Sequence, residues 1–246
     1  MRKLYTFVLL LLSALTIFSQ APERQSVYKY KLGLDIPVAV ITLGTGGTSL
    51  LLHHKSKPLT ADEVNALKIT DVNKFDRSAI YRHSQACKVT SDVFQYTSMV
   101  APALLFIDKD IRKDYSTVLP IWAETFALTA ALTSFTKELA DRKRPYVYNP
   151  DYPLEKKLNR EAKASFFSGH TSITAASTFF IAKVYADYHP HSKYKPLFWT
   201  TAAVIPAITG LCRYGAGKHY FTDILVGYAI GATVGILVPH LHKRAF

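Results

Sequence analysis

Apolar and polar residues alternate in long blocks along this chain, and the apolar blocks have the length of helices. Six such runs, dominated by Ala, Thr, Ile and Leu, cover residues 36–52, 93–107, 117–136, 171–188, 196–211 and 224–240. None of them alternates at the period of two that a half-buried strand requires. The pattern therefore predicts an all-α fold, a helical bundle.

The apolar runs leave two interpretations open, a membrane bundle and a soluble exported domain. Most are shorter than the roughly 20 residues that span a bilayer. Glu124 and Lys183 interrupt two of them, and the mean hydropathy is only +0.07. However, runs 36–52, 196–211 and 224–240 carry no Asp, Glu, Lys or Arg, and aromatic residues flank several ends as at a membrane interface. We therefore expect membrane association.

The N-terminus has the layout of a signal peptide, because Arg2 and Lys3 precede an apolar run over 4–18 and small or polar residues follow to Ala21. An uncleaved anchor is the alternative. The expected organisation is a signal peptide or anchor over 1–21, an apolar segment plus polar connector over 22–92, and a helical domain over 93–242. We expect an exported chain.

The net charge of +12, from 30 Lys and Arg against 18 Asp and Glu, favours an anionic partner such as a phosphate group or a lipid head group. Nucleic acid is not expected, since an exported chain rarely meets it and no binding motif is present. The two cysteines, Cys87 and Cys212, could form a disulfide in an oxidising compartment or remain as buried free thiols.

Three polar clusters contain residue types that bind or transfer phosphate. In the first, Lys137 and Arg144 are seven residues apart, so a continuous helix would bring both to nearly the same face. A solvated basic patch is the alternative, because Arg142 and Lys143 lie between them. Pro145 limits how far such a helix continues.

The second cluster, Ser168-Gly169-His170, directly precedes the apolar run 171–188. A helix beginning here would direct free backbone N–H groups at an anion, and Gly169 would allow close approach. Ser168 adds a hydroxyl donor and His170 could deliver a proton. An ordinary helix cap is the alternative.

The third cluster contains Arg213, His219 and Asp223. His219 and Asp223 are four residues apart and face each other on a helical turn. A carboxylate on one imidazole nitrogen leaves the other free as a nucleophile, while the planar guanidinium of Arg213 suits phosphate oxygens. A purely structural His–Asp hydrogen bond is the alternative.

Together the order K-x6-RP, SGH and R-x5-H-x3-D resembles the signature of the type 2 phosphatidic acid phosphatase and vanadium haloperoxidase superfamily. The resemblance implies that His219 attacks phosphorus, Asp223 orients it, and His170 protonates the leaving alcohol and then activates water. It assigns the non-bridging oxygens to Lys137, Arg144, Arg213, Ser168 and the Gly169 amide. No metal or other cofactor is implied. Phe167 and Cys212 depart from the proline and serine usual in the family.

The resemblance implies a phosphatase acting through a phosphohistidine, most simply on a lipid or isoprenoid-lipid phosphate. The alternatives are a soluble exported acid phosphatase for small esters, a vanadate-dependent haloperoxidase and a non-catalytic binding protein. We expect the site to face the periplasm or exterior, although a cleaved leader followed by six spanning segments would place it in the cytoplasm. If the 36–52 run does not span, that conflict disappears.

The paired histidines at 53–54, 189–191 and 240–242 lack cysteine or acidic ligands at useful spacing in the sequence. They are interpreted as interface or solvent histidines. Glu124 is interpreted as a polar contact between helices.

Overall fold

The computed structural model describes residues 26–244, so the predicted signal peptide lies outside the described part. The all-α prediction is confirmed, since residues 26–244 contain helices and no strand, only an isolated bridge between Tyr28 and Lys243. The long helices are α2 (Leu32–Lys55), α4 (Gln85–Val100), α6 (Tyr115–Ala140), α7 (Gly169–Tyr188), α8 (Lys195–Gly215) and α9 (Phe221–His242).

Shorter elements connect these helices. They are α3 (Ala61–Ala66), α5 (Lys109–Lys113) and the 3-10 turns η1 (Ile69–Asp71), η2 (Arg77–Ala79), η3 (Ala101–Ile107), η4 (Pro145–Val147), η5 (Leu154–Lys156) and η6 (Arg160–Lys163). The apolar run 93–107 is therefore not one helix, because α4 ends at Val100 and η3 follows. The expected domain boundary between residues 92 and 93 falls within α4.

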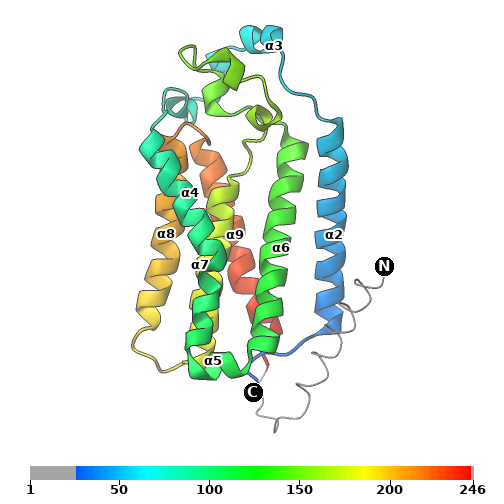
Figure 1. Cartoon of the computed structure of the whole chain (residues 1–246), viewed down its shortest axis with the longest axis vertical. Helices are drawn as coiled ribbons and strands as arrows, with labels where there is room; N and C mark the ends of the chain where they lie inside the picture. Colours follow the sequence, from blue (N-terminus) through cyan, green and yellow to red (C-terminus); the bar gives the residue numbers. More distant parts are fainter. Residues whose placement is uncertain (1–25, 245–246) are drawn as a thin grey trace, which may run out of the picture.

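Helix α7 is the centre of the bundle and packs against α4, α6, α8 and α9 (Figure 1). Its closest approach is to α9, where Gly227, Gly231 and Gly235 form a stripe at four-residue spacing. A Cβ atom at Gly231 would lie 2.1 Å from the Ser172 carbonyl oxygen, so the backbones of the two helices touch there. Because the stripe begins opposite Ser168, it fixes the start of α7 against the start of α9.

Helix α2 stands at the edge of the bundle, beside α6 (Figure 1). Its 24 residues are about 36 Å long, enough to cross a bilayer. Leu32, Val40 and Leu43 are 73%, 64% and 75% exposed. In the described chain, α2, α9 and the segment Tyr115–Val147 are long and apolar enough to span a membrane. Such exposed apolar surface indicates that the protein is located in a membrane.

The three predicted clusters gather at one end of the bundle, the upper end in Figure 1, where α6 and α8 end and α7 and α9 begin. Helix α6 ends at Ala140 because Asp141 adopts a left-handed conformation, with φ of 44°. The connection 141–168 then crosses this end before α7 begins at its N-cap, Ser168.

Candidate active site

A cavity of about 510 Å³ opens at this end of the bundle. Five of the predicted site residues line it, namely Lys137, Arg144, His170, Arg213 and His219. The other three, Ser168, Gly169 and Asp223, are buried and do not line the cavity. The structure therefore brings the three clusters together. Five of their residues line the cavity, and the three buried residues lie behind its wall.

His219 is 1% exposed and is held through one ring nitrogen. Its Nδ1 lies 2.8 Å from the backbone carbonyl oxygen of Ser165, so Nδ1 carries the proton and donates. Nε2 then keeps its lone pair, which is the arrangement that a nucleophile needs. Burial, followed by the nearby cations Arg144 and Arg213, lowers the pKa of His219 well below its usual value of 6.5. The imidazole is therefore neutral at physiological pH.

Asp223 is fully buried and acts on His219 mainly through Ser165. Its Oδ2 lies 3.7 Å from His219 Nδ1, longer than a hydrogen bond. The same oxygen accepts from the Ser165 hydroxyl at 2.6 Å and from the Tyr220 backbone N–H at 2.9 Å. Asp223 thus fixes the segment whose carbonyl orients His219, an indirect contact that its four-residue spacing did not reveal.

Arg142 neutralises Asp223 and was missed by the sequence analysis, which treated it as evidence for a solvated basic patch. Its guanidinium pairs with Asp223 and, at 2.9 Å, with the buried Asp76. The guanidinium also lies over the Tyr220 ring, 4.2 Å from the centroid. The interpretation as a solvated basic patch is therefore wrong for Arg142, whose ion pairs hold Asp223 in place behind the cavity.

His170 and Arg213 share a carboxylate that the sequence analysis also missed. Asp92, on α4, accepts from His170 Nε2 at 2.8 Å and from Arg213 Nη1 at 3.2 Å. Arg213 Nε is buried and has no hydrogen-bond partner among the described residues. Buried N–H donors are nearly always paired, so this donor is an exception; Arg213 lines the cavity, but its Nε is closed to solvent.

Lys137 and Arg144 reach the cavity from different elements, so the expectation of one shared helix face is wrong. Lys137 is on the last turn of α6, whereas Arg144 follows the break at Asp141 in an extended conformation. Arg144 is held by Glu161, through Nε to the carbonyl oxygen at 2.7 Å and Nη2 to the carboxylate at 3.0 Å. The two cations still converge on the cavity.

The start of α7 combines a cap with a close approach. The Ser168 hydroxyl caps the helix at Thr171 N, 3.4 Å away, and lies 2.9 Å from the Thr171 hydroxyl. A Cβ atom on Gly169 would lie 3.1 Å from the Thr133 side chain and 3.4 Å from Lys137 Nζ. Gly169 therefore leaves room for the Lys137 ammonium group. The Ser168 hydroxyl acts as the N-cap of α7.

Three further cations, Lys88, Lys156 and Lys218, line both this cavity and an adjoining one of about 560 Å³. None of them has a carboxylate partner within residues 26–244. Lys218 lies over the Tyr146 ring, 4.4 Å from its centroid. Burial, and then repulsion by Arg144 and Arg213, lowers the pKa of Lys218 to about 8. The mouth of the site is therefore strongly positive.

Cys87 and Cys212 are neighbours on α4 and α8, and both are free thiols in this structure. The alternative of two free thiols describes this state, and their contact joins the two helices close to Arg213.

The sequence comparison identifies the family to which this arrangement belongs. Residues 120–246 match the model of the PAP2 superfamily. This range contains every predicted site residue. The chain belongs to the PAP2 superfamily. It is 29% identical over 152 residues to phosphatidylglycerophosphatase B of Bacillus subtilis (strain 168), covering 60% of this chain and 70% of that protein. With the phosphatase names of its relatives, this membership makes the chain a phosphatase.

Two further similarities involve a rat protein and a solved structure. Phospholipid phosphatase 1 of Rattus norvegicus is 29% identical over 131 residues, 44% of this chain and 46% of the rat protein. The crystal structure of a transmembrane PAP2 type phosphatidylglycerolphosphate phosphatase from Bacillus subtilis aligns with a TM-score of 0.49 and 22% identity, over 84% of this chain and 94% of that one.

Proposed function

We propose that this PAP2 protein hydrolyses the terminal phosphate of a lipid or isoprenoid-lipid phosphate through a phosphohistidine on His219, without a metal ion. The observation that carries the proposal is the neutral, buried His219 with a free Nε2, which lines a cavity together with the cations Lys137, Arg144 and Arg213.

In the first step, His219 Nε2 forms a bond to phosphorus and the bond between phosphorus and the alcohol oxygen breaks. Burial, followed by Arg213, lowers the pKa of His170 to about 3 in the empty cavity, so the proposal requires that the bound phosphate, whose negative charge offsets Arg213, protonates it. Protonated His170 then transfers its proton to the alcohol oxygen, so the alcohol leaves neutral. In the second step, His170 takes a proton from water, the resulting hydroxide attacks phosphorus, and His219 is released together with phosphate. Together the two steps return His170 and His219 to their starting protonation states.

The cations stabilise the extra charge of the trigonal-bipyramidal state. Lys137, Arg144 and Arg213 reach the cavity directly, whereas Ser168 and Gly169 contribute through the N-terminus of α7. In this assignment Asp223 keeps the Ser165 carbonyl on Nδ1 and thereby keeps the proton off Nε2. Asp92 accepts hydrogen bonds from both His170 and Arg213 and thereby fixes the positions of the two side chains relative to each other.

A lipid substrate is supported by the exposed apolar helices and by the names of the relatives. The catalytic end of the bundle would lie at the membrane surface, where a lipid phosphate is presented. A soluble ester could enter the same cavity, but a soluble enzyme would not need an exposed apolar helix such as α2.

The test is release of phosphate by detergent-purified protein in the presence of a chelator, from a lipid phosphate and from a water-soluble phosphate ester. We expect release from the lipid, and its loss in His219→Gln. His54→Gln, at the exposed end of α2, is the control and should behave as wild type. Acid-labile, base-stable ³²P on the wild-type protein but not on His219→Gln would support the intermediate. Full release by His219→Gln would contradict it.

We also propose that the active end faces the exterior. Helix α2 begins at the opposite end, so this orientation requires the end near residue 32 to face the cytoplasm. The proposal can be tested with single cysteines at two exposed residues, after Cys87 and Cys212 are replaced by serine. Leu154 is in η5, within the connection at the active end, and Tyr194 is the N-cap of α8, at the opposite end. An impermeant maleimide should label residue 154 in intact cells; labelling only residue 194 would reverse the orientation.

A further inference from the structure

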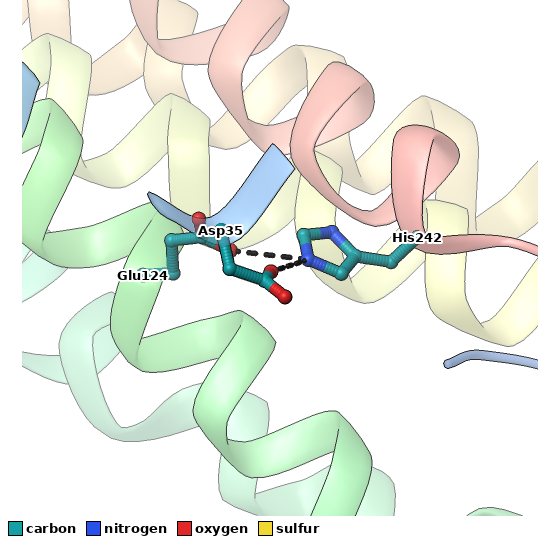
Figure 2. Close-up of side chains that lie close together, drawn as sticks. All are labelled: Asp35, Glu124 and His242. Atoms are coloured by element: carbon teal, nitrogen blue, oxygen red, sulfur yellow. Dashed lines mark hydrogen bonds and ion pairs between the residues drawn. The ribbon is translucent and has the colours of Figure 1, made fainter. Parts of the chain in front are cut away.

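Three metal-ligand side chains meet at the end of the bundle opposite the active site. They are Asp35 on α2, Glu124 on α6 and His242 on α9, and one ligand atom from each lies within 4.8 Å of the others (Figure 2). His242 Nε2 is 2.6 Å from Asp35 Oδ1 and 3.4 Å from Glu124 Oε2. Spacing along the chain gives His242 no acidic partner, because both carboxylates come from distant helices.

Two other atoms of this cluster are already engaged, because Asp35 Oδ2 accepts from the Lys31 backbone N–H at 2.8 Å and His242 Nδ1 faces a carbonyl oxygen. His242 Nδ1 lies 2.8 Å from the Val238 carbonyl oxygen and therefore donates to it. In the neutral imidazole, Nε2 then has only a lone pair, and it points at two carboxylates. Such a contact requires a proton or a metal ion between the groups. A backbone carbonyl on the second ring nitrogen is also the usual support of a metal-ligating histidine.

Charge balance favours a divalent metal ion over a proton. A proton on His242 leaves the cluster with a net charge of −1, since two carboxylates face one imidazolium. The side chain of His242 is 1% exposed and those of Asp35 and Glu124 are 26% and 18% exposed, so an uncompensated charge here is only partly solvated and is costly. The nearby Lys31 ammonium donates to the carbonyl oxygens of Leu241 and Lys243 and makes no ion pair with either carboxylate in the described chain. A divalent ion with neutral His242 gives a net charge of zero.

The space around the cluster provides room for a further ligand. Asp35, Glu124 and His242 line a cavity of about 620 Å³ whose other walls are mostly apolar, including Leu43 and Ile121. Ligand atoms around a tetrahedral zinc ion with bonds of about 2.1 Å are roughly 3.4 Å apart. The separations in the cluster, from 2.6 Å up to at most 4.8 Å, include that value.

We propose that Asp35, Glu124 and His242 form a binding site for a divalent transition metal of the zinc class, with one coordination position open to the cavity. One imidazole and two carboxylates are a ligand set that zinc accepts. The site is separate from the phosphatase cavity and takes no part in phosphate transfer. It links the peripheral helix α2 to α6 and α9.

The experiment uses full-length protein without a polyhistidine tag, purified in detergent, stripped with a chelator and then dialysed against Zn²⁺. Mass spectrometry of the eluted metal should give about one zinc per chain. Glu124→Gln and His242→Gln should lose it. His53→Gln is the matched control, because His53 pairs with a single carboxylate, that of Glu138, at 2.9 Å; this variant should retain the metal.

Co²⁺ substitution of the wild-type protein gives a readout that depends on no variant. We expect visible d–d absorption of a four- or five-coordinate site, displaced by one equivalent of Zn²⁺. Wild-type protein that retains no zinc and gives no such absorption would overturn the proposal and leave the cluster as a buried ion pair. Equal zinc retention by wild type, His242→Gln and His53→Gln would also overturn it, because the metal would then be bound elsewhere.

Discussion

The Asp92→Asn substitution tests the part of the site that the sequence did not reveal. Asp92 Oδ1 holds His170 Nε2 at 2.8 Å and Arg213 Nη1 at 3.2 Å. Asparagine keeps the shape of the side chain and can still accept from Arg213, but it removes the negative charge beside His170. The change therefore isolates the effect of that charge on proton transfer.

The expected magnitude follows from the contact that is weakened. A hydrogen bond to a charged group contributes about 1.5–3 kcal/mol. At 1.4 kcal/mol per factor of ten, its loss corresponds to a fall in kcat of about 10- to 150-fold. KM should change less, because Lys137, Arg144 and Arg213 remain in the cavity. The protonated form of His170 also loses its partner, so the basic limb of the kcat profile should move to lower pH.

The assay is phosphate release from a lipid phosphate in detergent over a range of pH, with kcat and KM determined separately. Asp62→Asn, an exposed carboxylate on α3, is the control and should match wild type. Activity within about twofold of wild type and an unmoved pH profile in Asp92→Asn would refute the reasoning. Asp92 would then only neutralise Arg213 in the empty enzyme.

Three other predictions follow from the packing and charge of the bundle. Gly231→Ala should destabilise the protein by about 1–3 kcal/mol, measured by thermal unfolding in detergent, because the new Cβ meets the α7 backbone. Gly33→Ala is the control, because a Cβ there meets no atom within 4 Å and should not destabilise the protein. Arg142→Gln should lower the free energy of unfolding by about 3–5 kcal/mol in the same assay, because it leaves the buried Asp223 carboxylate without an ion-pair partner. Near-native stability would show that Asp223 is neutral. In ¹⁵N NMR, His219 should remain neutral with its proton on Nδ1 at a pH where an ordinary imidazole is already protonated, because its pKa is lowered by burial; titration near 6.5 would contradict that environment.

The sequence predicted the helices and five residues lining the cavity because both depend on local pattern. Apolar periodicity determines which segments become helices, and the spacing of the three clusters places them at helix ends. The helix break at Asp141 was not predicted, because a left-handed aspartate gives no stronger signal than the surrounding charged residues. Consequently Arg144 was assigned to the wrong element although its place in the site was anticipated.

The supporting residues were missed because their partners are distant in sequence. Asp92 meets His170 across 78 positions, and Arg142 meets Asp223 across 81. No spacing rule connects such pairs, since tertiary packing alone brings them together. The same reason explains His242, which was interpreted as an interface or solvent histidine, whereas α2 and α6 supply two carboxylates beside it.

The glycine stripe of α9 determines which parts of this enzyme can adapt to a new substrate. At the three glycines the backbones of α7 and α9 touch, which leaves little room there for sliding or repacking. We therefore expect α7, which bears His170, and the start of α9, two residues after His219, to move as one unit. Adjustment to different alcohol groups must then come from α4 and from the connection 141–168 on the other side of the cavity. Changes of specificity should accordingly accumulate in those segments, while the spacing of the two histidines stays constant.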